Sequence, residues 1–254
     1  MRIDGFDKLA RHVPELNSTG GSAKIAAYFI SVFTLTTIYF ILTDQIPTWT
    51  LDSQIVVMAL GYLILSRFFT QKKKLIEKHG ENAYRHAFGK YALPGLAIIF
   101  AALAHIAYMN GPKFTQPLIA AIFNWAGWIF IIIGAILAAR SVYTFGLDNV
   151  TMVYVYHPEQ GQIVRTSIYS IIRHPVYGGV LRLAIGMALL NGGIYPITFI
   201  LILPLLVFGW LRLVEEKELI ERVPEYAEYR KRVPAFFPYP DQLSVFFRFL
   251  ITGK

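Results

Sequence analysis

The chain has 254 residues, of which 55% are hydrophobic, 15% aromatic and only 16% charged. This balance is too apolar for an ordinary soluble domain of that length, so it predicts a membrane protein with much of its apolar surface in lipid. The chain contains no cysteine, which excludes disulfides, thiolate metal sites and a cysteine nucleophile. The first 22 residues have no apolar core and do not resemble a cleaved signal peptide.

Apolar stretches recur along the chain at the length of membrane spans. A helix that crosses the hydrocarbon core needs roughly 20 mostly apolar residues, because its backbone polar groups must be bonded internally there. The sequence predicts about six such helices and therefore an all-α, polytopic fold: approximately 25–43, 51–69, 91–109, 117–139, 176–190 and 194–214. The fifth is short, and the Asn191-Gly192-Gly193 turn after it permits only a tight antiparallel hairpin.

Lysine and arginine are concentrated in the segments that meet one side of the bilayer. They occur before the first span, between the second and third spans, before the fifth and after the sixth, whereas the opposite loops hold only Lys113. The positive-inside rule then places both termini in the cytoplasm. We interpret Lys72–Lys74 as a contact with anionic lipid rather than with nucleic acid, because it adjoins a span. The net charge of +8 therefore indicates membrane lipids as partners and no nucleic acid.

Polar side chains gather around the last predicted hairpin. The segment 150–175 and the tail from Arg212 onward both join its two helices, so their cytoplasmic ends are expected to form a pocket. Arg182 lies about two turns inside the fifth span, where a charged group is costly and is a functional candidate by default. Arg212 and Glu216 stand four residues apart and share a helix face, on which they could pair.

The order and spacing of several motifs resemble one known family. They are Tyr169-Ser-Ile-Ile-Arg173-His174-Pro175-Val-Tyr177-Gly-Gly179, then Arg212-x-x-Glu215-Glu216-x-x-Leu219, and Glu225-Tyr226-x-x-Tyr229-x-x-Arg232-Val233-Pro234. This pattern is similar to the signature of the isoprenylcysteine carboxyl methyltransferase and phospholipid methyltransferase superfamily. The resemblance covers residues 163–238 and lacks the His and the Gly-Pro that the family often has ahead of Tyr169.

The resemblance implies a membrane-embedded pocket for S-adenosylmethionine, formed by the last two spans and the tail. We expect one membrane domain over 1–254, with a four-helix region at 1–149 and a methyltransferase-like cofactor-binding region at 150–240. The implied cofactor contacts are Ile163, Val164, Tyr169, His174, Pro175, Val176, Tyr177 and Glu216. Arg212 and Glu216 are the expected catalytic residues, and Arg212 and Arg182 are the expected substrate contacts. No metal is expected, and the chain has no G-x-G-x-x-G motif of a soluble dinucleotide fold.

Elementary chemistry makes these roles reasonable. Aromatic faces, an anion and hydrogen-bond donors suit a sulfonium cofactor that carries an adenine, an ammonium and a carboxylate. Methyl transfer is a direct displacement that depends on positioning and on exclusion of water. The acceptor, lipophilic or small, would react through a carboxylate, thiol or amine. Two other classes stay open: an NADPH-dependent sterol or ene reductase, and a non-enzymatic polytopic module.

Overall fold

The computed structural model of the chain describes residues 5–160 and 165–253. Within these ranges the chain is helical, and its isolated β-bridge, between Lys113 and Gly193, belongs to no strand. Five helical stretches are long and apolar enough to cross a bilayer: Thr19–Thr43, Thr50–Thr70, Lys72–His105, Pro117–Phe145 and Ile194–Arg222. The prediction of an all-α, polytopic membrane protein is therefore confirmed.

Three of these stretches are single helices, namely α2 (Thr19–Thr43), α3 (Thr50–Thr70) and α7 (Pro117–Phe145). The other two are composite. The first combines α4 (Lys72–His79), a 3-10 turn (Gly80–Asn82), α5 (Ala83–Ala87), a π-helical turn (Phe88–Ala92) and α6 (Leu93–His105). The last combines α11 (Ile194–Trp210), a second π-helical turn (Leu211–Glu215) and α12 (Glu216–Arg222). Helix α7 runs to Phe145, past the predicted end at residue 139.

The fifth predicted span corresponds to α10 (Pro175–Asn191), which is apolar but has only 17 residues. Its proline occupies the first helical turn, where a missing amide hydrogen costs nothing, and Gly192 ends it in a left-handed conformation (φ 67°). A helix of this length extends about 26 Å, against about 30 Å for a bilayer core. Helix α10 is thus shorter than a standard span.

Glycines allow α10 to pack closely against α7. A Cβ atom added to Gly134 would lie 2.8 Å from the carbonyl oxygen of Gly179, and one on Gly186 would lie 2.7 Å from that of Gly127. The two backbones therefore touch along much of their length, because no side chain separates them. This contact fixes where the N-terminus of α10 lies relative to the end of α7.

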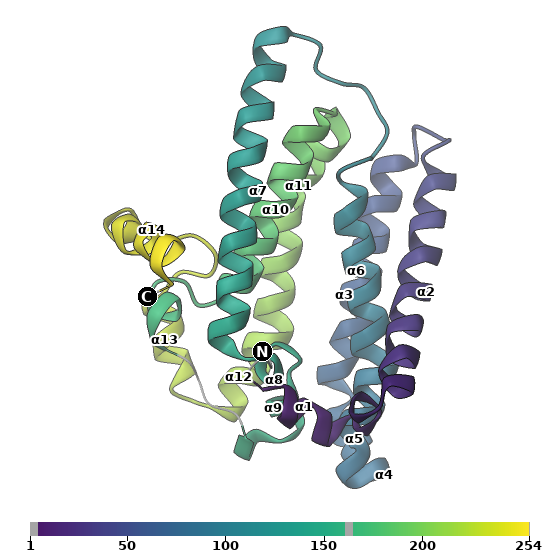
Figure 1. Ribbon diagram of the computed structural model, residues 1–254, viewed down its shortest axis with the longest axis vertical. Helices are drawn as coiled ribbons and strands as arrows, with labels where there is room; N and C mark the ends of the chain where they lie inside the picture. The colour runs from purple at the N-terminus through teal and green to yellow at the C-terminus, as the bar shows by residue number, and fades with distance from the viewer. Residues whose placement is uncertain (1–4, 161–164, 254) are drawn as a thin grey trace.

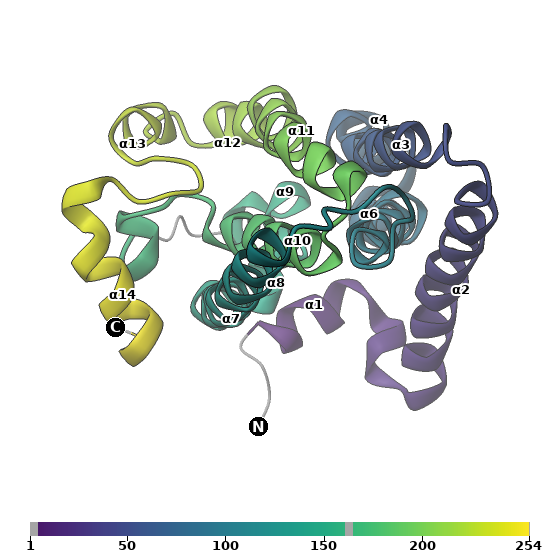
Figure 2. The same ribbon diagram turned by 90° about the horizontal axis from the view of Figure 1, so that it is seen from above.

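The helices form two groups. In Figure 1, α2, α3 and α6 stand together on one side, and α7, α10 and α11 on the other. Figure 2 shows the same groups from above, with α11 beside α3. At this junction the Trp210 indole donates a hydrogen bond to Ser66 Oγ at 2.9 Å. The two groups share one buried core, which includes Phe68, Leu181 and Phe199.

Large apolar side chains cover the outside of the spans. Leu35, Leu63, Leu118, Leu201 and Leu205, on α2, α3, α7 and α11, are 65–73% exposed. In water so much exposed apolar surface would be unfavourable, whereas in a bilayer it faces hydrocarbon. The exposed leucines therefore mark the surface that contacts lipid.

Polar residues close the end of the bundle that lies at the top of Figure 1. The Asn191 side-chain amide donates to the carbonyls of Ile106, Ala107 and Met109. Nearby, His105 is fully buried: its Nδ1 lies 2.8 Å from Gln54 Oε1 and its Nε2 lies 3.1 Å from Asp44 Oδ2.

The opposite end, termed here the basic end, holds most of the short helices. Helices α1 (Phe6–His12), α8 (Leu147–Val150), α9 (Val153–Tyr156) and α13 (Tyr226–Arg232) lie there, together with α4, α5 and α12. The segments rich in Lys and Arg therefore meet on one side of the bundle. Lys8 of α1 pairs with Asp148 of α8 at 3.1 Å. Helix α14 (Leu243–Thr252) lies beside α7, where Arg140 donates to its Phe249 carbonyl.

Candidate functional site

The candidate site lies at the basic end, where α10 begins and α11 ends. The Gly192 turn makes α10 and α11 an antiparallel hairpin, which brings Pro175 close to the π-helical turn Leu211–Glu215. A π-helical turn inserts one extra residue per turn and redirects the side chains that follow it. Here it precedes Glu215 and Glu216, both of which are buried.

Backbone hydrogen bonds fasten the tail to the start of α10. The amide of Arg173 donates to the Pro234 carbonyl, and the amide of His174 donates to the Ala235 carbonyl, both at 3.0 Å. The Tyr229 hydroxyl donates to the Tyr169 carbonyl at 2.5 Å. These contacts fold α13 and the residues after it back over the mouth of the hairpin.

Glu216 is the centre of a buried ionic cluster and is 1% exposed. Its Oε1 accepts hydrogen bonds from Arg173 Nε at 2.6 Å and from His174 Nε2 at 3.0 Å. Its Oε2 lies 3.7 Å from Arg212 Nη1 and 3.6 Å from Arg230 Nη1. Three guanidinium groups and an imidazole therefore surround one carboxylate, and the expected proximity of His174 and Glu216 is confirmed.

Glu215, the neighbouring carboxylate, has different surroundings. It accepts a hydrogen bond from the Tyr177 hydroxyl at 2.7 Å, and its Oε1 lies 3.7 Å from His174 Nδ1. Among the described residues it forms no ion pair with an arginine or lysine. The two adjacent glutamates are thus distinguished by their partners, since three arginines surround Glu216 and, in the described part of the chain, none pairs with Glu215.

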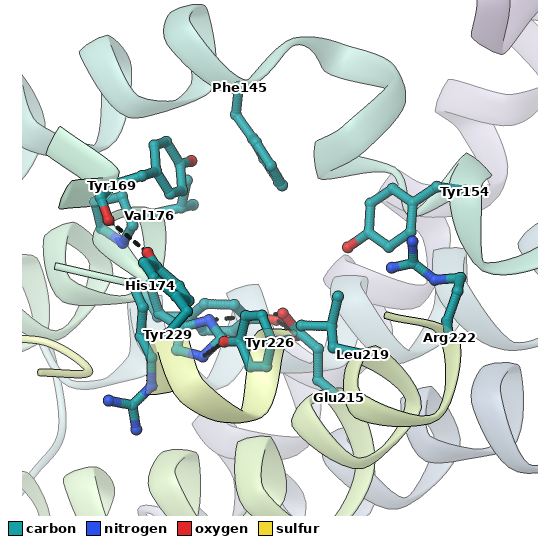
Figure 3. A pocket seen from close by; sticks show the side chains of 13 residues that line it. Phe145, Tyr154, Tyr169, His174, Val176, Glu215, Leu219, Arg222, Tyr226 and Tyr229 are labelled. Carbon is teal, nitrogen blue, oxygen red and sulfur yellow. Dashed lines mark hydrogen bonds and ion pairs between the residues drawn. The ribbon is translucent and has the colours of Figure 1, made fainter. Parts of the chain in front are cut away.

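A cavity opens between these groups, with an empty volume of about 600 Å³. Figure 3 shows Tyr169 and Val176 on one side of it, Tyr154 and Arg222 on the other, and Phe145 above. Aromatic and charged side chains dominate its lining, which consists of Phe145, Tyr154, Tyr169, Arg173, His174, Pro175, Val176, Tyr177, Glu215, Leu219, Arg222, Tyr226 and Tyr229.

One wall of the cavity carries an unsatisfied polar group. The Tyr169 hydroxyl is buried and has no hydrogen-bond partner in the described part of the chain, although the ring stacks on Phe145 at 5.1 Å. Burial raises the pKa of Tyr169 and of Tyr226 above the usual tyrosine range, so both stay protonated at neutral pH. A buried hydroxyl without a partner is costly, so a ligand that bonds to it would be favoured.

The arginines near the cavity are engaged with protein groups. Arg173 donates to Glu216 and to the Val233 carbonyl. Arg222 donates to Glu218 at 3.1 Å, and its guanidinium lies 4.4 Å from the centre of the Tyr154 ring. The cations at the rim are therefore already paired.

Five of the residues predicted as cofactor contacts line the cavity: Tyr169, His174, Pro175, Val176 and Tyr177. Glu216 lies directly behind His174 and does not line it. Arg212 is half-exposed, pairs with Glu216 and lies 5.8 Å from the Phe208 ring centre. Ile163 and Val164 lie outside the described residues.

Arg182 is buried and faces protein, as expected, but it does not line this cavity. Its Nη1 donates to the Gly178 carbonyl at 2.8 Å and to the Phe236 carbonyl at 3.1 Å. The guanidinium also lies 4.5 Å from the Phe237 ring centre. These contacts connect α10 to the tail.

Sequence reasoning missed three lining residues, namely Phe145, Tyr154 and Arg222. Phe145 ends α7, six residues beyond the predicted span, and Tyr154 belongs to a one-turn helix. The only signal for Tyr154 was the aromatic alternation of Tyr154-Val-Tyr156. In the described ranges no group of three or more His, Asp or Glu side chains is placed to hold a metal ion.

Comparisons with known proteins point to the same region. Residues 122–223 match the family model of the phospholipid methyltransferases. Two curated relatives, described as probable protein-S-isoprenylcysteine O-methyltransferases, come from Oryza sativa subsp. indica and subsp. japonica. Each is 26% identical to this chain over 110 residues, which are 42% of the chain and 56% of the relative.

The chain thus spans about half the length of the curated relatives it matches. No solved structure matches it. The family match extends from α7 to the end of α12 and so includes the cavity walls Phe145, His174 and Glu215. Together, the family match and the two relatives show that this region of the chain is similar to the isoprenylcysteine and phospholipid methyltransferases.

Proposed function

We propose that the chain is an S-adenosylmethionine-dependent methyltransferase that binds its cofactor in the cavity between α10, α12 and α13. One observation carries the proposal: within the described residues, the cavity walls combine aromatic rings, a hydroxyl without a hydrogen-bond partner and the carboxyl group of Glu215, which pairs with no arginine or lysine. Bound S-adenosylmethionine would supply a methyl group on a positively charged sulfur.

The residues present fit this cofactor. Glu215 offers negative charge to a sulfonium or ammonium group, since no arginine or lysine pairs with it in the described chain. The Tyr154 and Tyr177 rings offer faces for a cation or an adenine. The Tyr169 hydroxyl offers a hydrogen bond that no described residue makes.

Glu216 and His174 act as a pair in this proposal. The Glu216 carboxylate accepts hydrogen bonds from Arg173 and His174, and Arg173 also donates to the carbonyl of Val233 in the tail. The predicted role of Glu216 as a cofactor contact is thereby refined, since it supports the cavity wall from behind. The lining aromatics exclude water from the reacting groups, which strengthens electrostatic attraction within the site.

Arg212 is proposed to orient the methyl acceptor. It is half-exposed at the basic end, next to the apolar outer surface that carries Phe208 and Leu213. Its planar guanidinium suits a carboxylate, which is ionised at neutral pH and needs no general base. An acceptor with an apolar chain could reach this position from the lipid. We therefore favour a lipophilic carboxylate, with a thiol or an amine as alternatives.

The basic end is proposed to face the cytoplasm, with both termini there. The support is the positive-inside rule together with the gathering of Lys and Arg at that end. A nicotinamide cofactor is not favoured, because its phosphates would need free cations. Arg173, Arg182 and Arg222 are already engaged by carboxylates, carbonyls and rings.

Binding and turnover test the proposal separately. Purified protein should bind S-adenosylmethionine and its demethylated product, and NADPH should not compete. Membranes incubated with radiolabelled methyl donor should yield a labelled, organic-extractable product, and its base lability would distinguish an ester from an amine or a thioether. A folded protein that binds neither form of the cofactor would refute the proposal.

Variants of Arg212 test its role. Arg212→Ala should lower turnover more than cofactor affinity, and Arg212→Lys should restore little because it lacks the planar donor pair. Arg248→Ala, which removes an exposed arginine of α14, is the matched control and should leave both unchanged. Equal losses of turnover and of cofactor affinity in Arg212→Ala would contradict an acceptor-facing role.

A further inference from the structure

A second cavity is lined by residues of α4, α5 and the π-helical turn after them. Figure 1 shows α4 and α5 at the basic end, away from α13 of the candidate site. The cavity has an empty volume of about 700 Å³. It is lined by Gln71, Lys74, Leu75, Lys78, His79, His86, Lys90 and Tyr91, and is termed here the lysine cavity. The methyltransferase proposal uses none of these residues.

The lining is positively charged and lacks a counter-charge. Lys74, Lys78 and Lys90 face the cavity, and no aspartate or glutamate is among its lining residues. In the described chain none of the three forms an ion pair, whereas Lys72, next to them in sequence, pairs with Glu218 at 3.6 Å. Like charges that share a concave site repel one another, so an anion bound there would relieve the repulsion.

The donors come from two directions. Lys74 and Lys78 stand four residues apart on α4 and so share one face of it. Lys90 belongs to the π-helical turn Phe88–Ala92 and lies 5.4 Å from the centre of the Tyr91 ring. Ammonium groups from both elements could therefore bond to different oxygens of one ligand, as phosphate sites require.

Two histidines add to the same wall. The rings of His79 and His86 stack with centroids 3.8 Å apart and an interplanar angle of 25°. Two stacked imidazoles cannot both be protonated without strong repulsion, unless an anion lies close to them. Their ring N–H groups therefore add hydrogen-bond donors to a wall that already carries three ammonium groups.

The cavity also lies next to the membrane. Gln71, one of its lining residues, caps the C-terminus of α3, whose exposed Leu63 faces lipid. Basic pockets at such positions are suited to lipid headgroups. We propose that the lysine cavity binds a phosphate group, carried by an anionic lipid or free in solution, through Lys74, Lys78 and Lys90.

The test uses the full chain in detergent and native mass spectrometry with phosphatidic acid as the probe. Phosphatidylcholine, whose phosphate is neutralised by its own ammonium, serves as the comparison lipid. The wild type should retain phosphatidic acid in preference to phosphatidylcholine. Lys74→Ala combined with Lys78→Ala should weaken that binding by about tenfold or more.

The matched control is Lys24→Ala combined with Lys217→Ala. It removes the same charge from exposed sites at the basic end outside the cavity and should change binding by less than about twofold. Millimolar inorganic phosphate distinguishes the sources: displacement of the lipid indicates a general phosphate site, and no displacement indicates a lipid site. Equal losses in both double variants, or no preference for phosphatidic acid in the wild type, would overturn the proposal.

Discussion

Replacement of Glu216 by glutamine removes the charge at the centre of the ionic cluster while keeping the size of the side chain. Glu216 accepts two close hydrogen bonds from charged donors, Arg173 at 2.6 Å and His174 at 3.0 Å. Each bond of this kind contributes about 1.5–3 kcal/mol, and loss of one partner of a buried pair costs about 3–5 kcal/mol. Because glutamine retains one acceptor, we expect a loss near the lower limit, about 3 kcal/mol.

That energy affects the closure of the tail over the cavity. At about 1.4 kcal/mol per factor of ten, a loss of about 3 kcal/mol lowers the population of the closed tail by about two orders of magnitude. The apparent dissociation constant of S-adenosylmethionine should rise in the same proportion, provided that the wild-type tail is barely more stable closed than open. The thermal midpoint of the purified protein should fall as well. Calorimetric titration and a thermal melt in detergent measure the two effects.

Two companion variants make the experiment decisive. Glu221→Gln removes the same charge from an exposed position of α12 and should change neither quantity. Glu215→Gln keeps an acceptor for the Tyr177 hydroxyl, so the melt should be unchanged while affinity for the positively charged cofactor falls about tenfold. A Glu216→Gln protein with a wild-type melt but no cofactor binding would refute the supporting role and place Glu216 on the ligand itself.

Three further predictions concern other parts of the fold. Asp44→Asn should lower the thermal midpoint, because it leaves buried His105 without its carboxylate at a cost of about 3 kcal/mol; exposed Asp52→Asn is the control, and equal melts would contradict the reasoning. Arg182→Met should expose the tail to proteases, because the bonds to Gly178 and Phe236 are lost. The hydrogen bond from Arg85 lowers the pKa of the Glu15 carboxyl group. The bond therefore stabilises the N-terminal segment fully at pH values above the usual pKa of glutamate, and this stabilisation is lost as the pH falls through the lowered pKa. Hydrogen exchange near Leu16 should therefore increase only in acid, and by less than about 1 kcal/mol of protection.

The spans could be predicted from sequence because lipid permits few solutions. Any segment that crosses the hydrocarbon core must be helical, so the apolar runs locate α2, α3, α6, α7 and α11. Their ends were less predictable. Helix α7 continues to Phe145, whose side chain lines the site, while Arg140 bonds to α14. The π-helical turn Leu211–Glu215 leaves no signature in composition.

Part of the candidate site could likewise be predicted from sequence, and part could not. The turn at Gly192 implied that the polar segments flanking the last hairpin would meet, and His174 and Glu216 do meet. The distinction between the two glutamates could not be read from sequence, because it depends on which carboxylate the π-helical turn directs toward the arginines. Tyr154 and Arg222 come together only through tertiary packing.

The carbonyls of Pro234 and Ala235, bonded to the amides of Arg173 and His174, also constrain the order of assembly. During translation α7, α10 and α11 enter the bilayer while the last wall of the cavity is still unsynthesised. A nascent chain that ends before residue 234 therefore lacks both carbonyls that close the site. In a series of stalled chains of increasing length, only those in which these carbonyls are available would then retain S-adenosylmethionine.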